Sequence, residues 1–385
     1  MDLVRPLGLA GIDCAVVAKP QARARYSRFV RAVIEWADPW PDPEALICRL
    51  TSFGASQHER PVLYYGTDWD LLMVSRHRER LAKTFRFVIP DADLVETLVD
   101  KDRFAALAGE LRLPVPPSRR VAAGASAGDA DLRYPLIVKP VTRQIATWGA
   151  VAGGGKGVRV DDSAALRRLL DGLADAGVDV ILQELIPGPE TRIESHHAYV
   201  DETSAIAGEF TGRKIRTHPR EHGYSTAIEI TAEPDVAELG REVLRSIGLR
   251  GVAKLDFKRD PGGALHLLEI NPRFNLWHHP GALAGVNLPA LAFDDAVGLP
   301  RAAPGVARAG VRWCHVGRDA RARRDEGIPL VPWLRWVGSC EAKSGLAIDD
   351  LAPTLRGTAA RTAERAAAAV ASRARKLRGA GRATA

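Results

Sequence analysis

The chain has 385 residues, of which 46% are hydrophobic, and a formal net charge of +7. This length predicts two or three lobes, and no apolar run is long enough to cross a membrane, so we expect no membrane partner. The N-terminus lacks the basic-then-apolar order of a signal peptide. Four scattered cysteines without a C-x-x-C pair are typical of reduced thiols, which predicts a cytoplasmic location.

Much of the positive charge lies in the tail at 361–382, and the sequence has no zinc-finger, RRM or basic-zipper pattern. We therefore do not expect a nucleic-acid partner. A basic balance also suits an enzyme that handles anionic nucleotides and carboxylates.

The first 93 residues alternate strand-like and helix-like segments, which predicts a doubly wound parallel sheet. The expected strands are 12–17, 61–65 and 85–89, the expected helices are 43–53 and 68–78, and 27–36 suits either. Ligands bind such sheets at the carboxyl ends of the strands, so Gly66, Thr67 and Asp68 form a candidate substrate loop. A simple turn and helix N-cap explains Thr67 and Asp68 at least as well.

Residues 94–111 are predicted to be helical, with a break near Asp100. Asp93 is the expected N-cap, and Glu96 would complete a capping box. Lys101 lies between apolar pairs and, taken alone, is best interpreted as a solvated helix lysine. The proline-rich stretch at 113–118 is extended and marks a domain boundary.

Two features of the next segment suit a phosphate ligand. The buried strand 136–140 contains Lys139, whose ammonium must find an anion or reach water. A glycine run could bring backbone amides close to phosphate oxygens, although a plain hairpin turn fits it too, and it lacks P-loop spacing. The run consists of Gly153, Gly154, Gly155, Lys156 and Gly157.

A strand at 180–186 then runs into a Pro-Gly break, which predicts a hinge between lobes. Backbone groups there could bind an adenine edge, and Glu190 could hold a ribose hydroxyl, although an ordinary strand end is the simpler interpretation. The hinge residues are Gln183, Glu184, Leu185 and Ile186.

A hairpin around the turn at Gly262 and Gly263 is the most informative stretch. Folding it there places Asp256 opposite Glu269 and Lys254 opposite Asn271. Alternation along the strands assigns Leu267 to the same face, and it assigns the following residues to the buried face: Ala253, Leu255, Phe257, Leu268 and Ile270.

Two carboxylates placed directly opposite each other repel, unless a cation lies between them. The oxygen ligands Asp256, Glu269 and Asn271 suit Mg²⁺ or Mn²⁺. The alternative is an ordinary hairpin with a solvated acidic face.

Two further segments are candidates for substrate binding. Arg213 and Arg216 lie in a basic stretch that we expect to be a polar loop, where it could bind an anion or simply face solvent. His278 follows the metal strand, in a segment that could tune substrate choice, although packing by Trp277 explains that segment equally well.

Taken in order, these motifs resemble the ATP-grasp superfamily of carboxylate–amine ligases over roughly residues 85–300, closest to its D-aspartate ligase-like and carbamoyl-phosphate-synthase-like branch. The resemblance implies an α/β ATP-grasp fold with α+β lobes. The implied parts are an N-terminal doubly wound domain at 1–93, a linker helix at 94–117, a small ATP-binding lobe at 118–190, a large metal-binding lobe at 191–305 and an extension at 306–385.

The same resemblance implies the roles of individual residues. Lys101, Lys139 and the glycine run would bind ATP phosphates, and the hinge with Glu190 would bind adenine and ribose. Asp256, Glu269 and Asn271 would hold the metal. Arg273, with Lys254, would stabilise the transferring group.

The implied reaction joins a small carboxylate to an amine through an acyl phosphate, with ADP as a product. An ATP-grasp kinase or carboxylase is an alternative, and a nucleotide-binding regulator without catalysis is another. A homodimer is an open alternative to a monomer.

Overall fold

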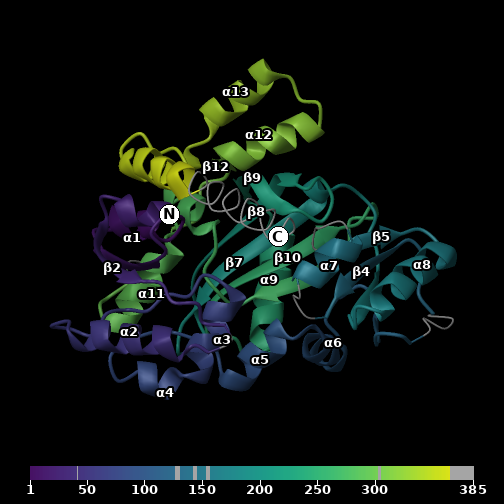
Figure 1. The fold of residues 1–385 in the computed structure, drawn as a ribbon, viewed down its shortest axis with the longest axis horizontal. Coiled ribbons are helices and arrows are strands. Elements are labelled where there is room, and N and C mark those ends of the chain that lie inside the picture. Colours follow the sequence, from purple (N-terminus) through teal and green to yellow (C-terminus); the bar gives the residue numbers. More distant parts are fainter. Residues whose placement is uncertain (41, 126–130, 142–144, 153–156, 302–304, 365–385) are drawn as a thin grey trace, which may run out of the picture.

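The computed structural model describes residues 1–40, 42–125, 131–141, 145–152, 157–301 and 305–364, and the description below is confined to them. A large sheet occupies the centre, with the N-terminal region on one side and a small lobe on the other (Figure 1). None of the described helices is long and apolar enough to cross a membrane.

The N-terminal region contains parallel pairings, as expected. Strands β1 and β2 pair in parallel, and Val62 forms an isolated parallel bridge with Arg86. The segments 61–65 and 85–89 make this single bridge instead of full strands, and 27–36 contains a strand, not a helix. The elements are α1 (Val4–Leu9), β1 (Cys14–Ala18), η1 (Arg23–Tyr26), β2 (Val30–Glu35), α2 (Glu44–Ala55), α3 (Asp68–Arg76) and α4 (Arg78–Leu81).

Two short helices, α5 (Ala92–Val99) and α6 (Lys101–Glu110), connect this region to the small lobe. The predicted break at Asp100 is confirmed, because its side chain caps α6 by accepting from the amides of Asp102 and Arg103. The predicted N-cap of the first helix is wrong by two residues, since Asp91 accepts from the amide of Asp93.

The small lobe is a four-stranded antiparallel sheet in the order β3-β6-β4-β5. One face packs on α8 through a core that contains Leu136, Val138 and Leu166. The opposite face carries Ile137, Lys139 and Gln183. Its elements are β3 (Ser118–Val121), β4 (Leu136–Pro140), α7 (Ile145–Ala152), β5 (Val158–Val160), α8 (Ser163–Ala174) and β6 (Val180–Glu184).

The large sheet has seven strands in the order β11-β10-β7-β8-β9-β12-β13. Helix α9 packs on one face, while α10, α11 and the N-terminal helices pack on the other. The strands of this sheet are β7 (Ile193–Val200), β8 (Ile206–His218), β9 (Tyr224–Thr231), β10 (Gly251–Arg259), β11 (Leu265–Asn271), β12 (Arg312–His315) and β13 (Ala342–Ser344). The short helix η2 (Glu190–Arg192) precedes them, and the covering helices are α9 (Pro234–Ser246), α10 (His278–Leu283) and α11 (Leu288–Val297).

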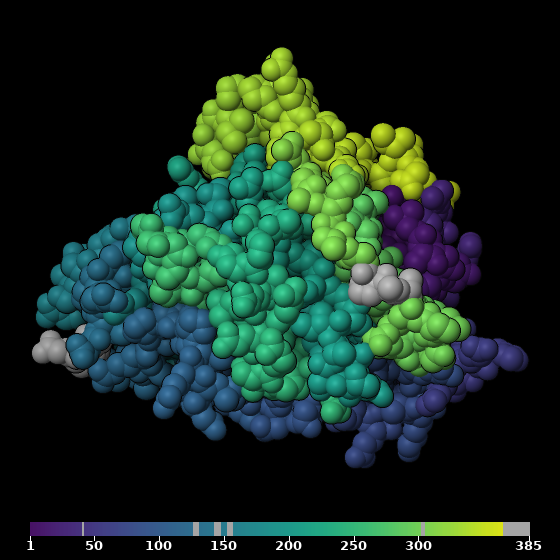
Figure 2. Space-filling model, turned by 180° about the vertical axis from the view of Figure 1, so that it is seen from behind, coloured from purple at the N-terminus to yellow at the C-terminus, as the bar shows by residue number. Residues whose placement is uncertain are grey.

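The segment beyond residue 305 continues this sheet, because β12 pairs with β9 and β13 pairs with β12. Helices α12 (Val316–Asp325) and α13 (Leu330–Ser339) lie between these strands in the chain and project from the top of the molecule in Figure 1. Seen from behind, this yellow-green segment again forms the top of the molecule (Figure 2).

The β10–β11 hairpin has the predicted register, with Lys254 opposite Asn271 and Asp256 opposite Glu269. The predicted faces of two leucines are wrong. A bulge beyond Asp256 pairs Phe257 with Leu267, so Leu267 is buried in the core under α9. Leu268 instead turns to the face that carries the two carboxylates.

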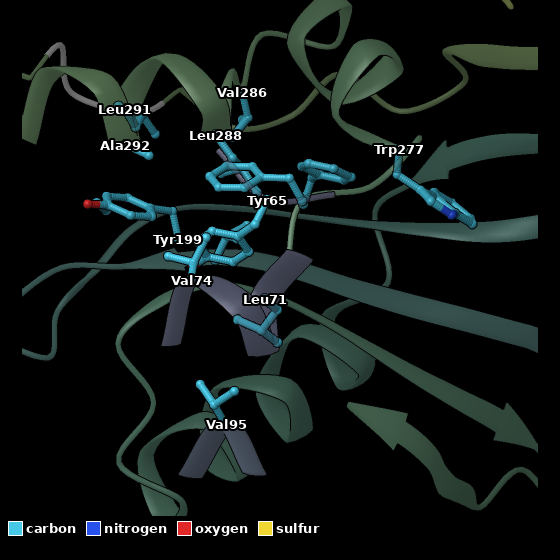
Figure 3. Close-up of a cluster of buried hydrophobic side chains, with 14 of the residues drawn as sticks. Tyr65, Leu71, Val74, Val95, Tyr199, Trp277, Val286, Leu288, Leu291 and Ala292 are labelled. Carbon is cyan, nitrogen blue, oxygen red and sulfur yellow. The ribbon is translucent and has the colours of Figure 1, made fainter. Parts of the chain in front are cut away.

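The largest core lies between the large sheet, α11 and the N-terminal helices. Figure 3 shows Tyr199 of the sheet beneath Leu288 and Leu291 of α11, with Leu71 of α3 below. Trp277 belongs to this core and is 1% exposed. Its ring lies over Gly212 of β8, where a Cβ atom would be 2.5 Å from the ring and 2.9 Å from a backbone oxygen.

We therefore expect Gly212→Ala to displace Trp277 and to lower the free energy of unfolding by about 1–3 kcal/mol, since overpacking strains a close-packed core. The matched control is Gly109→Ala in α6, where an added Cβ meets nothing within 4 Å. The control should be neutral or stabilising by about 1 kcal/mol. Urea denaturation of the three proteins measures both effects, and equal stability of the two variants would contradict the close contact at Gly212.

Candidate functional site

A cavity of about 650 Å³, partly open to solvent, lies between the small lobe and the large sheet. Polar side chains line it on two opposite walls, one formed by the small lobe and the other by the large sheet. The lining consists of Ile137, Lys139, Gln183, Glu184, Leu185, Ile186, Glu190, Ile193, Lys214, His222, Gly223, Asp256, Lys258, Leu268 and Glu269.

The wall from the small lobe contains Lys139 and the predicted hinge. The Lys139 ammonium donates to Oε1 of Gln183 at 2.7 Å, so the two side chains lie on one face of neighbouring strands. Glu184 accepts from Nη2 of Arg133 at 2.9 Å. Burial opposes the charge of Glu184, but the hydrogen bonds from Arg133 hold the pKa of this carboxyl below its ordinary value.

The wall from the large sheet is centred on Asp256, which is 1% exposed. Its Oδ2 accepts from the Lys254 ammonium at 2.6 Å and lies 3.8 Å from the Lys214 ammonium. Its Oδ1 accepts a hydrogen bond from the Ser195 hydroxyl. A buried carboxylate is costly unless it is paired and hydrogen-bonded, and these three groups meet that requirement.

The pKa values of the two lysines around this carboxylate shift in opposite directions. Burial lowers the pKa of Lys254, and Asp256 only partly offsets this effect. Burial also opposes the charge of Lys214, but the carboxylates of Asp256, Glu269 and Glu190 together raise its pKa above the ordinary value. The surrounding carboxylates therefore favour the charged form of Lys214 in the cavity wall.

The predicted metal ligands share one face of the hairpin. Glu269 lies directly opposite Asp256, and Asn271 is two residues further along its strand. Within the described residues there is no group of three or more histidine, cysteine, aspartate or glutamate side chains that could hold a metal ion. The available donors are two carboxylates and one amide oxygen beside a cavity, a set of hard oxygen ligands that fits Mg²⁺.

Lys101 is the first residue of α6, and its ammonium donates to the carbonyl oxygen of Pro140. It therefore lies beside the end of the strand that carries Lys139. Gly153, Gly154, Gly155 and Lys156 lie outside the described residues. Gly157 packs against strand β4, where a Cβ would approach Ile137 to 2.9 Å.

Arg273 follows the hairpin and does not line the cavity. Its Nη2 donates to Oδ1 of Asn271 at 3.1 Å, and its Nε donates to Oδ1 of Asp68. The candidate loop at 66–68 thus reaches the hairpin through Asp68. Thr67 is a helix N-cap within a capping box that Asp70 completes.

The three residues predicted for substrate binding also lie away from the cavity lining. Arg213 and Arg216 are in strand β8, not in a loop, and they pair with Glu229 and Asp319 respectively, each at 2.7 Å. His278 is fully buried, and burial lowers its pKa to about 3. It packs edge-on against Phe274.

Several cavity residues were missed in the sequence. Lys214 lies within the basic stretch, but its direction could not be known while that stretch was taken for a loop. Lys258 continues the alternation of Lys254 and Asp256 along the strand, so this pattern could have placed Lys258 on the cavity face. His222 has a left-handed backbone, with φ of 54°, and its buried Nε2 has no hydrogen-bond partner.

Comparison with known proteins identifies relatives of the region that forms this site. A family model described as "ATP-grasp in the biosynthetic pathway with Ter operon" matches residues 178–317. The D-aspartate ligase of Enterococcus faecium is 25% identical over 300 residues, which cover 74% of this chain and 71% of that protein. The D-alanine–D-alanine ligase of Xanthomonas axonopodis is 28% identical over 202 residues, covering 47% of this chain and 57% of that protein.

Among solved structures, the chain is similar to the biotin carboxylase domain of the Hydrogenobacter thermophilus 2-oxoglutarate carboxylase, which was solved with magnesium ADP and bicarbonate. The TM-score is 0.60 at 16% identity, and the match covers 80% of this chain and 70% of that chain. At this identity the likeness concerns the fold.

The buried charges around Asp256 predict how the site responds to mutation. Asp256→Asn should lower the free energy of unfolding by about 3–5 kcal/mol, because two buried ammonium groups lose their partner. Lys254→Met should cost less, because Lys214 still faces the carboxylate. Urea denaturation without nucleotide or divalent metal measures both, and an Asp256→Asn protein as stable as the parent would contradict this electrostatic account.

Proposed function

We propose that this chain, which belongs to the ATP-grasp superfamily of carboxylate–amine ligases, activates a small carboxylic acid with ATP and joins it to an amine. The fold and the ligase class predicted from the sequence are confirmed by the comparisons. The proposal that an amino acid is a substrate draws on the relatives, which are named for D-aspartate and D-alanine.

The observation that carries the proposal is the composition of the cavity walls. Lys139 and the hinge lie on one side, and Lys214 lies with Asp256 and Glu269 on the other. Cations suit the phosphates of ATP, while carboxylates suit a divalent metal that accompanies them. We place adenine and ribose against the hinge and Glu190, and the triphosphate between Lys139 and the hairpin, with Lys101 and the glycine run as further contacts.

In the first step, an oxygen of the substrate carboxylate attacks the γ-phosphorus of ATP. The bond from that phosphorus to the β–γ bridging oxygen breaks, so ADP leaves and an acyl phosphate forms. Mg²⁺ or Mn²⁺ held by Asp256, Glu269 and Asn271 would neutralise charge on the β- and γ-phosphates. Lys214 and Arg273 supply further positive charge, with Lys254 beside them.

In the second step, a neutral amine attacks the acyl carbon. The bond from that carbon to the phosphate oxygen breaks, phosphate leaves, and the nitrogen gives up a proton as the amide forms. Positioning and electrostatics account for such a reaction without a nucleophilic serine, cysteine or histidine. The four cysteines of the chain are free thiols, which agrees with the proposed cytoplasmic location. That the chain forms a homodimer stays a prediction.

ADP formation should depend on a carboxylate, and amide formation should depend on an amine as well. The test incubates the protein with ATP, Mg²⁺ and panels of D- and L-amino acids and other carboxylates, then measures ADP and identifies products by mass spectrometry. An amide with ADP and phosphate supports the proposal. ADP formation that requires a carboxylate but never an amine would contradict it and favour a kinase or carboxylase.

Glu269→Gln should lower kcat by about 100-fold or more, because it removes a charge opposite Asp256 at the site of phosphoryl transfer. The matched control is Glu202→Gln, in an exposed turn between β7 and β8. The control should keep kcat within about twofold. An equal kcat of the two variants would contradict a role of Glu269 in the reaction and with it the proposed metal site.

A further inference from the structure

An ion pair connects the N-terminal region to the hairpin. Asp68 is the first residue of α3, and Arg273 lies two residues beyond Asn271. Nε of Arg273 donates to Oδ1 of Asp68 across 205 residues of sequence. The two side chains are only 18% and 15% exposed, so the pair is shielded from solvent and differs from an ordinary surface salt bridge.

The backbone on the Asp68 side of the pair is held rigidly. The side chain of Thr67 accepts from the amide of Asp70, and the Asp70 side chain accepts from the amide of Thr67 at 3.0 Å. This capping box fixes the first turn of α3, in which Asp68 lies. The backbone from which the Asp68 side chain extends is therefore fixed by local hydrogen bonds.

The Arg273 side is held against the same N-terminal segment. The amide of Phe274 donates to the carbonyl oxygen of Tyr65 at 3.2 Å. The Phe274 ring meets the rings of Tyr64 and Tyr65 edge-on, with centroid distances of 4.8 and 5.6 Å. Because this packing already joins the two segments, the ion pair is not needed to hold them together.

The guanidinium of Arg273 has a second contact on the hairpin. Its Nη2 donates to Oδ1 of Asn271 at 3.1 Å. A guanidinium is planar and rigid, so fixing Nε and Nη2 also fixes the direction of Nη1. Asp68 therefore controls how the charge of Arg273 is presented at the end of the hairpin.

We propose that Asp68 is a positioning residue for Arg273, which it holds in the orientation that meets the charge developing on the transferring phosphoryl group. This inference rests on the proposed ligase reaction. In this proposal Asp68 acts through Arg273, and a neutral amide in its place would weaken the charge-assisted hydrogen bond to Nε. Groups that orient a functional residue in this way typically change activity by about 10- to 100-fold when they are replaced.

The test compares Asp68→Asn with Asp70→Asn, which makes the same charge change in the same helical turn on a side chain that contacts Gly66 and Thr67. Asp68→Asn should lower kcat by about 10- to 100-fold and leave the KM for ATP within about twofold. Asp70→Asn should keep kcat within about twofold, with at most a few degrees of lower Tm. Equal loss of kcat in both variants would overturn the proposal and indicate a structural role of the turn.

A second readout does not depend on activity. In protein labelled with ¹⁵N-arginine, the Nε–Hε signal of Arg273, assigned with Arg273→Lys, should be protected from exchange in the parent and in Asp70→Asn. It should broaden or disappear in Asp68→Asn. A signal unchanged in Asp68→Asn would overturn the proposal, even if the parent showed no ligase activity, in which case the proposed function would fail separately.

Discussion

The buried carboxylate of Asp256 is the interaction on which the site depends. It lies on β10, the strand next to the edge strand β11 of the seven-stranded sheet, and is 1% exposed, so its charge must be balanced inside the protein. Lys254 from its own strand, Lys214 from β8 and Ser195 from β7 provide that balance. Three strands are thereby tied to one charged group, and Lys214 also faces a cavity in which ATP phosphates would need a cation.

The N-terminal region completes the site from another direction. Its contacts with the segment after the hairpin are both apolar and ionic, through Phe274 and Arg273 respectively. The small lobe approaches from the opposite side and supplies Lys139 and the hinge. The proposed reaction centre thus lies where three parts of the chain meet, so the residues proposed to act there are up to about two hundred positions apart in sequence.

The sequence predicted those features that depend on local or pairwise rules. Alternation and the Gly-Gly turn were sufficient to place Asp256 opposite Glu269, and the predicted helix break near Asp100 is where the Asp100 side chain caps the next helix. Alternation failed for Leu267 and Leu268, because a bulge adds one residue to the strand and no turn residue signals it.

The sequence also could not predict which charged side chains pair when they lie far apart along the chain. The basic stretch around Lys214 gave no sign that Arg216 would be neutralised by Asp319, 103 residues later, while Lys214 turned to the cavity. The pairing of Asp68 with Arg273 was hidden for the same reason. A helix N-terminus is sufficient to explain an aspartate there, and only the fold shows what that aspartate contacts.

A crystal structure with a non-hydrolysable ATP analogue and Mg²⁺ would test the central claim most directly. The account predicts adenine against the Gln183–Ile186 hinge and the triphosphate between Lys139 and the hairpin. The metal should contact Asp256 and Glu269. A nucleotide bound elsewhere, or phosphates that contact neither Lys139 nor the metal at the hairpin, would contradict it.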